Sequence, residues 1–222
     1  MAEKIQKHDF VELDYTGKLT DGTVFDTTQK SVSESSGLHA HDKVFAPAVV
    51  CIGERQLLPG LDDALVDKEM GKEYSVTLPP EKTFGKKDIK KMKIVPMNAF
   101  KEHKVQPHPG LQIDMDGERG VITQISGGRV IVNFNNPLAG REIVYDFKVN
   151  KKITDQKEQA IIYLHNSFGI PKDKVNVEIK EQKATVELPF EFPAQILELL
   201  SKKMIDLVKL KEVKFTKKEV KK

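Results

Sequence analysis

The feature that most constrains the fold is a two-residue alternation of apolar and polar side chains near the N-terminus, from Phe10 to Leu19. Such a period places every second residue, Tyr15 among them, on one face, as in a strand that is buried on one side. Asp21-Gly22 then supplies a turn that tolerates positive φ, and the segment from Thr23 to Asp26 returns as a second strand. The sequence therefore predicts a β-hairpin at the start of the chain.

The residues after this hairpin predict a loop, a strand, a short helix and another strand. The segment from Thr27 to Gly37 is rich in Ser, Thr and Gln without apolar periodicity, so we expect a surface loop there. The apolar run from Pro47 to Ile52 predicts a strand. Leucines on one helical stripe predict a helix between Leu58 and Leu65, with acidic residues in its first turn, where the helix dipole favours them. The alternation from Tyr74 to Leu78 predicts a further strand, which Pro79-Pro80 stops.

The character of the chain changes near residue 87, where a lysine-rich stretch begins. Short apolar segments follow, separated by Gly117 and by Gly127-Gly128, and they predict a compact β-rich module. Alternation resumes from Glu142 to Val149, where we expect the chain to rejoin the sheet that the first strands began.

The tail beyond about residue 153 has a pattern of its own. It contains a helical stripe with Ala160 and Leu164, a hairpin of Val175 to Ile179 with Ala184 to Leu188, and an amphipathic helix from Ile196 to Val208. We expect a small α+β domain. Because its core is short for independent stability, docking or self-association is expected.

The charge balance argues against several classes of partner. The net charge of +3 arises mainly from lysines interleaved with glutamates, and only the segment from Lys209 to Lys222 is clearly basic, which is more typical of a solvated face than of an acidic-partner site. The longest apolar runs are far too short to span a bilayer, and the N-terminus lacks the apolar core of a secretion signal. We therefore expect a cytoplasmic protein without nucleic-acid or membrane partners.

Cys51 and the histidines are the candidates for reactive or metal-binding groups. Cys51 is the only cysteine, so no intramolecular disulfide can form, and beside Ile52 it is expected to be a small buried apolar residue rather than a nucleophile. His39 and His41, together with His8, could bind a metal, but no cysteine or acidic cluster completes a ligand set. We expect neither a metal nor another cofactor.

Three ordered segments carry a family resemblance: the hairpin from Val11 to Asp26, the stretch from Ile52 to Leu61, and the loop from Pro79 to Gly85. In this order they resemble the opening hairpin, the strand-to-helix crossing and the next loop of the FKBP-type peptidyl-prolyl cis-trans isomerases. The segments Val95 to Phe100 and Asn136 to Gly140 resemble the insert-in-flap domain of the SlyD-like branch of that family. Long FKBPs of archaeal type carry an added C-terminal domain, and the motif match here ends at about residue 152.

The resemblance implies an α+β fold with three domains. Residues 1–86 and 139–152 are expected to form the FKBP isomerase domain, an antiparallel sheet wrapped on a short helix and completed by the strand Ile143 to Phe147. Residues 87–138 are expected to form the β-rich insert-in-flap chaperone domain. Residues 153–222 are expected to form the small α+β C-terminal domain.

The resemblance also implies where the catalytic site lies. It surrounds an apolar pocket for the proline ring with the following residues: Tyr15, Phe25, Asp26, Leu57, Leu58, Leu61, Phe84 and Tyr145. In this interpretation Tyr15 and Asp26 orient polar groups, and the backbone N–H of Leu58 binds a substrate carbonyl. Leu61 forms the floor where the family often has tryptophan, and Phe84 stands where it often has tyrosine; we expect turnover to survive both differences. On spacing alone, the apolar members are more often ordinary core residues than pocket lining.

The implied function is prolyl isomerisation with chaperone activity on unfolded or proline-containing polypeptides. The reaction needs no nucleophile, because an apolar pocket that disfavours the planar, charge-separated amide relative to the twisted transition state accelerates rotation. The inserted domain is expected to hold clients through these apolar side chains: Val95, Met97, Phe100, Leu111 and Met115. The alternative is a non-catalytic holdase chaperone or scaffold.

The C-terminal domain has a separate expected role. Its last helix presents an apolar stripe of Ile196, Leu199, Leu200 and Met204, which one small domain need not cover. The stripe predicts either a homodimer through the C-terminal domain or an extension of the client surface.

Overall fold

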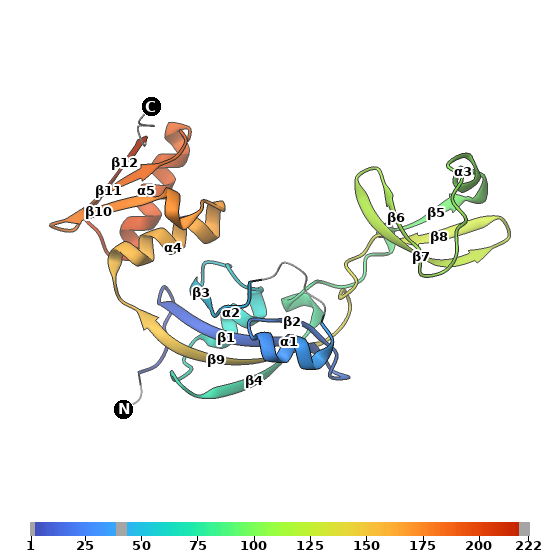
Figure 1. The fold of residues 1–222 in the computed structure, drawn as a ribbon, viewed down its shortest axis with the longest axis horizontal. Coiled ribbons are helices and arrows are strands. Elements are labelled where there is room, and N and C mark those ends of the chain that lie inside the picture. The colour runs from blue at the N-terminus through green and yellow to red at the C-terminus, as the bar shows by residue number, and fades with distance from the viewer. Residues whose placement is uncertain (1–2, 39–43, 218–222) are drawn as a thin grey trace. The chain divides into compact units, whose positions relative to one another are not determined.

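The computed structural model describes residues 3–38 and 44–217 and divides into two compact units (Figure 1). The first unit combines Met1–Leu78 with Ile143–Lys222, and the second is Pro79–Glu142. The boundaries predicted for the three domains remain a prediction, because the first unit contains both the N-terminal sheet and the C-terminal segment.

The first unit begins with the predicted hairpin. Strands β1 (Phe10–Leu19) and β2 (Val24–Thr27) are antiparallel neighbours. The turn between them closes with the Leu19 N–H donating to the Thr23 carbonyl at 2.9 Å, and Gly22 adopts a φ of 91°. This positive φ is the conformation for which the Asp-Gly pair was expected.

Strand β9 (Ile143–Ile153) runs antiparallel to the whole of β1, from Phe10↔Ile153 to Leu19↔Ile143. The sheet order is β2-β1-β9-β4, where β4 is Glu73–Leu78, and β3 (Ala48–Cys51) pairs with the first half of β1. The expectation that the chain returns to its first sheet is therefore confirmed.

Two short helices accompany this sheet. Helix α2 (Pro59–Leu65) was predicted; it begins with proline, whose fixed φ suits the first helical turn, and it buries Leu61 and Leu65. Helix α1 (Lys30–Ser36) corrects the prediction of a loop from Thr27 to Gly37. A seven-residue helix with one buried residue gives no apolar period to detect.

The second unit is a four-stranded antiparallel sheet of order β5-β8-β7-β6. Its elements are β5 (Met92–Pro96), α3 (Met97–Glu102), β6 (Gln112–Met115), β7 (Glu118–Ser126) and β8 (Arg129–Asn133). Two 3₁₀ turns, Pro80–Lys82 and Ile89–Lys91, precede β5. The buried core consists of Phe100, Ile122, Val130, Val132 and Phe134. The predicted β-rich module is therefore present.

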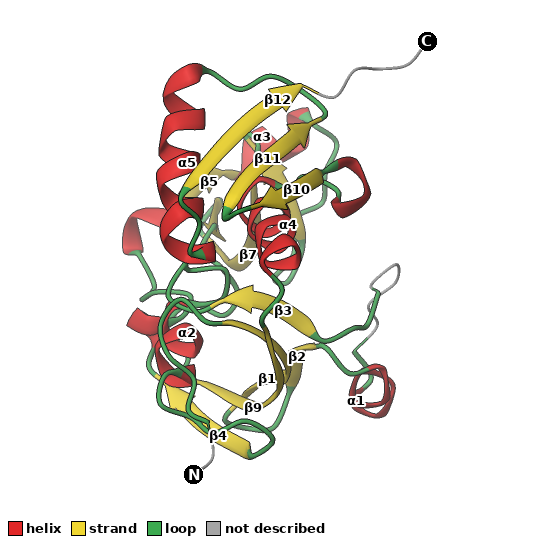
Figure 2. Ribbon diagram, turned by 90° about the vertical axis from the view of Figure 1, so that its left-hand side faces the viewer, coloured by secondary structure: helices red, strands yellow, loops and turns green. Residues whose placement is uncertain are grey.

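The C-terminal segment packs two helices on a three-stranded sheet (Figure 2). Its elements are α4 (Gln156–Phe168), the 3₁₀ turn Lys172–Lys174, β10 (Asn176–Lys180), β11 (Lys183–Leu188), α5 (Ala194–Val208) and β12 (Glu212–Lys217). The two helices and the hairpin were predicted, whereas β12, parallel to β11, was not. Among the described residues, no helix has the length and apolar character needed to cross a bilayer.

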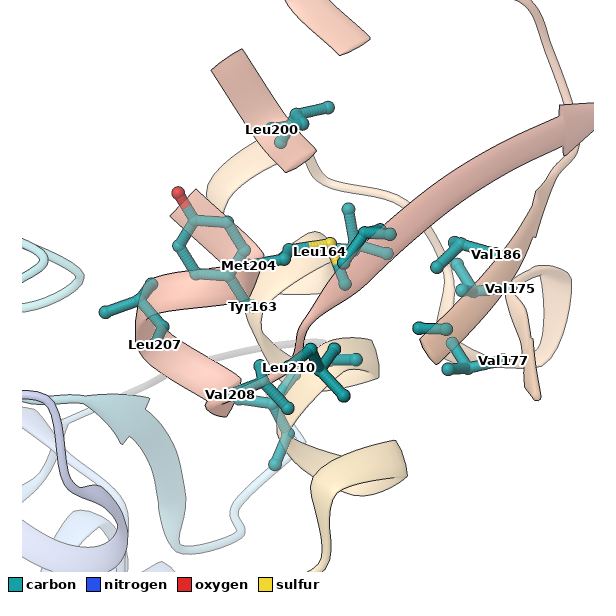
Figure 3. Packing of buried hydrophobic residues seen from close by; sticks show 14 of the residues in the cluster. Tyr163, Leu164, Val175, Val177, Val186, Leu200, Met204, Leu207, Val208 and Leu210 are labelled. Atoms are coloured by element: carbon teal, nitrogen blue, oxygen red, sulfur yellow. The ribbon is translucent and has the colours of Figure 1, made fainter. Parts of the chain in front are cut away.

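The core of the C-terminal segment continues into the first sheet. Its side chains gather between α4, α5 and the small sheet (Figure 3). Phe10, Cys51 and Ile153 belong to the same buried cluster, which joins this core to strands β1, β3 and β9. The apolar stripe of α5 is only half used: Leu200 and Met204 are buried, whereas Ile196 and Leu199 are 36% and 62% exposed.

Candidate active site

Three aromatic rings meet on one face of the N-terminal sheet. Tyr15 on β1 and Tyr145 on β9 lie edge to face, with centroids 5.8 Å apart, and Phe25 on β2 lies edge to face with Tyr145 at 6.1 Å. Gly17, opposite Tyr145 in the register, makes room for them. A β-carbon at Gly17 would come within 2.7 Å of Phe25 and 2.9 Å of Tyr145, so glycine is required for this aromatic box of Tyr15, Phe25 and Tyr145.

Asp26 adds one polar contact to the aromatic box. The Tyr15 hydroxyl donates to Asp26 Oδ2 at 3.0 Å. Burial raises the pKa of Tyr15, and the negative charge of Asp26 and this hydrogen bond raise it further. Burial, and then the charge of Asp26, likewise raise the pKa of Tyr145. Both phenols therefore stay neutral hydrogen-bond donors beside a carboxylate.

The three predicted leucines lie where β3 crosses to α2. Leu61 is 1% exposed, while Leu57 and Leu58 are half-buried. The Leu58 carbonyl accepts from the Leu61 and Asp62 N–H groups, both at 3.0 Å, and so starts the helix. Within the described part of the chain the Leu58 N–H has no acceptor. This amide is free to donate to a bound carbonyl.

The structure thus brings Tyr15, Phe25, Asp26 and Tyr145 into contact and fixes the segment that carries the leucines. Phe84 lies in the second unit, and its membership in the site stays a prediction. Gly17 was missed by the sequence reasoning. A glycine at an inward position of an otherwise alternating strand is the signal that points to it.

The second unit has a groove of its own, with a volume of about 360 Å³. Three of the predicted client-binding residues, Val95, Phe100 and Met115, line it; the other lining residues are Ala99, His103, Val105, Ile113 and Asp114. Met97 and Leu111 are not among the lining residues, although they pack partly against the core of the unit, as Val95 and Met115 also do. Ile113 was missed, although the alternation from Leu111 to Met115 places it on the same strand face as Met115.

Cys51 is fully buried, as expected. Burial, followed by the charges of Glu54 and Asp62, raises the pKa of its thiol to about 12, so it is not a nucleophile at neutral pH. His39 and His41 lie outside the described residues. Among the described residues no group of three or more His, Cys, Asp or Glu side chains has the geometry to hold a metal ion.

Comparison with known proteins finds family matches in both units. The family described as FKBP-type peptidyl-prolyl cis-trans isomerase matches residues 1–106, and the IF domain of FKBP26 matches residues 93–138. The first match contains Tyr15 and Phe25 of the aromatic box, and the second contains the residues that line the groove of the second unit.

Curated relatives agree with these family matches. A short-type peptidyl-prolyl cis-trans isomerase of Methanocaldococcus jannaschii is 30% identical over 149 residues, which cover 67% of this chain and 94% of the relative. The SlyD isomerase of Treponema pallidum is 28% identical, over 53% of this chain and 69% of the relative. An FKBP-type 16 kDa isomerase of Escherichia coli is 29% identical, over 67% of this chain and 94% of the relative. The chain therefore belongs to the FKBP-type peptidyl-prolyl cis-trans isomerases and carries the insert-in-flap domain of their SlyD-like members.

Proposed function

We propose that this isomerase turns over X-Pro bonds in the pocket of Tyr15, Phe25, Asp26, Leu57, Leu58, Leu61 and Tyr145, and that it accelerates proline-limited folding of unfolded polypeptides held by its insert domain. The aromatic box with its Tyr15–Asp26 hydrogen bond supports the first part. The enzyme's family membership stands against the alternative of a non-catalytic holdase or scaffold.

The pocket acts on a barrier that arises from amide resonance, roughly 18–20 kcal/mol. Twisting the X-Pro bond removes the charge separation of the planar amide, so an apolar wall favours the twisted form over the planar one. The free Leu58 N–H would hold a carbonyl of the substrate while the proline ring lies among the aromatic side chains. No group in the pocket has to give up a proton, which agrees with the raised pKa values of Tyr15 and Tyr145.

The groove of the insert domain supplies the capture step. Val95, Phe100 and Met115 offer apolar surface to an unfolded segment. The insert is tied to the isomerase sheet at both ends, after Leu78 and before Ile143. A client held by the insert is therefore presented to the pocket at a raised effective concentration.

Deleting the insert tests the capture step. The Gly140 N–H donates to the Gly85 carbonyl at 2.8 Å, so the two chain ends of the insert are already adjacent, and residues 87–138 can be replaced by a short glycine linker. We expect this deletion to slow catalysis of proline-limited refolding of an unfolded protein while tetrapeptide isomerisation persists. Equal refolding catalysis with and without the insert would refute capture, and a parent chain without tetrapeptide isomerisation would refute the proposed pocket.

Two further predictions differ in their support. A cytoplasmic location is proposed because folding clients are most abundant where chains are synthesised. A homodimer through the C-terminal domain is not part of the proposal, since Leu200 and Met204 of the predicted contact stripe are buried within the chain's own core. Unfolded or proline-containing polypeptides remain the proposed partners.

A further inference from the structure

The segment between β3 and α2 carries Leu57 and Leu58 but has no regular secondary structure. Two of its residues, Gly53 and Arg55, adopt positive φ angles of 86° and 54°. Its backbone is held from one side by α2, because the Asp62 carboxylate accepts from the Gly53 N–H at 2.9 Å and from the Arg55 N–H at 3.1 Å. Asp62 is 4% exposed, so these bonds satisfy a buried carboxylate.

The other side of this segment is held by the C-terminal helix α4. Gln56 Oε1 accepts from the Cys51 N–H at 2.9 Å and from Asn166 Nδ2 at 3.0 Å, and Gln56 Nε2 donates to Ser167 Oγ at 3.3 Å. Asn166 Nδ2 also donates to the Val49 carbonyl at 2.7 Å. One asparagine at the end of α4 therefore joins strand β3 to the residue that precedes Leu57.

Helix α5 adds a second anchor. Lys203 Nζ donates to both carboxylate oxygens of Glu54, at 2.8 and 2.9 Å. The Glu54 side chain is only 10% exposed, whereas that of Lys203 is 52% exposed. His8 Nε2 also lies 3.9 Å from a carboxylate oxygen of Glu54. Lys203 is the partner that carries a full positive charge at neutral pH.

A buried apolar cluster adjoins both the Asn166–Gln56 and the Lys203–Glu54 contacts. Cys51, which gives its N–H to Gln56, is buried in the same cluster as Tyr163, Met204 and Leu207 of helices α4 and α5. Figure 3 shows Tyr163, Met204 and Leu207 within this cluster. Because helices α4 and α5 pack against Cys51 through this cluster, the hydrogen bonds of Asn166 and Lys203 have a fixed geometry.

We propose that the C-terminal domain positions the catalytic pocket: Asn166 through Gln56, and Lys203 through Glu54, set the backbone of Leu57 and Leu58 for substrate binding. Asn166 and Lys203 are positioning residues that do not touch the substrate. The substrate-binding role of Leu57 and Leu58 in this inference rests on the proposed function. The claim that helices α4 and α5 fix the backbone of Leu57 and Leu58 does not depend on it.

Full-length variants test the inference. Lys203→Met and Asn166→Ala should each lower kcat/KM for a prolyl tetrapeptide by between about two- and thirtyfold, the range for residues that couple sites without touching a ligand. The matched control is Lys202→Met on the same helix, because Lys202 is exposed and its ion pair among the described residues is with Glu198, one turn away. We expect the control to keep the parent rate and Lys203→Arg to recover most of the loss.

A spectroscopic measurement separates positioning from general stability. In amide NMR spectra, Lys203→Met and Asn166→Ala should shift the Leu57 and Leu58 signals and leave in place those of β4, because the hydrogen-bond partners Val49, Gln56 and Glu54 lie outside that strand. The double exchange Glu54→Lys with Lys203→Glu should return the signals toward their parent positions.

Two outcomes would overturn the inference. One is unchanged Leu57 and Leu58 signals in both single variants; the other is an equal loss of activity in Lys202→Met. If the parent shows no tetrapeptide isomerisation, the proposed pocket fails instead, and the amide shifts still decide whether the helices position the segment. Asn166→Asp, which keeps the side-chain size but loses the two donated bonds, decides the same question should Asn166→Ala fail to fold.

Discussion

Tyr15 contributes both an aromatic ring and a hydrogen-bonding hydroxyl to the proposed pocket. Its ring packs against Tyr145, and its hydroxyl donates to Asp26 at 3.0 Å. Tyr15→Phe keeps the ring but leaves a partly buried carboxylate without this donor, which costs about 1–3 kcal/mol when the site is dry. We expect kcat/KM for a prolyl tetrapeptide to fall about tenfold, equivalent to ~1.4 kcal/mol.

The control for this variant is Tyr74→Phe. Tyr74 also loses a hydroxyl contact, the bond from the Glu69 N–H at 3.0 Å, but it lies on β4 and stacks on Phe147 outside the aromatic box. Equal activity loss in the two variants would show that the effect is general destabilisation, and an unchanged Tyr15→Phe enzyme would remove the hydroxyl from the site.

Asp146 on β9 gives a prediction of pH-dependent stability. Burial tends to raise its pKa, but hydrogen bonds from Lys18 and from Ser75 (2.6 Å) outweigh burial and hold the pKa below its usual 3.8. A lowered folded-state pKa stabilises the protein above the unfolded pKa, and this stability is lost as pH falls through the folded value.

Asp146→Asn should therefore lower the free energy of unfolding at neutral pH and match the parent in strong acid. Because the Asp146 side chain is 42% exposed, solvent screening keeps the loss below about 1 kcal/mol. Urea unfolding at several pH values measures it, with the exposed Glu34→Gln as control. A stability difference that persists unchanged into strong acid would mean that the charge of Asp146 plays no part.

At the level of elements, prediction from sequence succeeded where a period was long enough to count. The ten-residue alternation of β1 appears as expected, and so does the amphipathic pattern from Ile196 to Val208, which lies within α5. Helix α1 was not predicted, because only Ser33 of its seven residues is buried and the segment therefore has no apolar period. Strand β12 was missed because its neighbour β11 runs parallel to it, and a parallel partner leaves no turn signal between them.

Prediction of the site from sequence was likewise limited to residues within local patterns. The motif order indicated Tyr15, Asp26 and the leucines, because those residues lie within short, recognisable segments. Gln56 and Asn166, 110 residues apart in the chain, meet only in the folded protein, and no local pattern announces a contact of that separation.

The groove element of the insert gives a prediction in the intact chain. Met115 is half-buried at the groove, and Met115→Ser removes apolar surface that a client would cover, so we expect refolding catalysis to fall about two- to fivefold from lost burial. Tetrapeptide turnover should not change. The matched variant is Ile125→Ser, which loses a half-buried side chain of the same core outside the groove lining. A larger loss from Ile125→Ser would assign the effect to the stability of the insert.

At the scale of the whole molecule, the compact units do not follow the order of the chain. The insert interrupts the first unit, whereas the C-terminal helices share a buried cluster with the first sheet. Phe10, Cys51 and Ile153 are each at most 4% exposed because α4 and α5 cover them. Separation of the C-terminal segment would return these three side chains to water, so we expect it to unfold together with the isomerase sheet rather than before it.

Cys51 reports on this cooperativity in the full-length protein. Its thiol is fully buried and its pKa is about 12, so a thiol reagent can reach it only when the covering helices move away. If the sheet and the C-terminal segment open as one, the labelling rate across a urea series will follow the unfolded fraction measured by circular dichroism. Labelling at the rate of the unfolded chain while the circular dichroism is still native would mean that the C-terminal segment opens alone. The segment that carries Leu57 and Leu58 would then lose its contacts with α4 and α5 while the sheet stays folded.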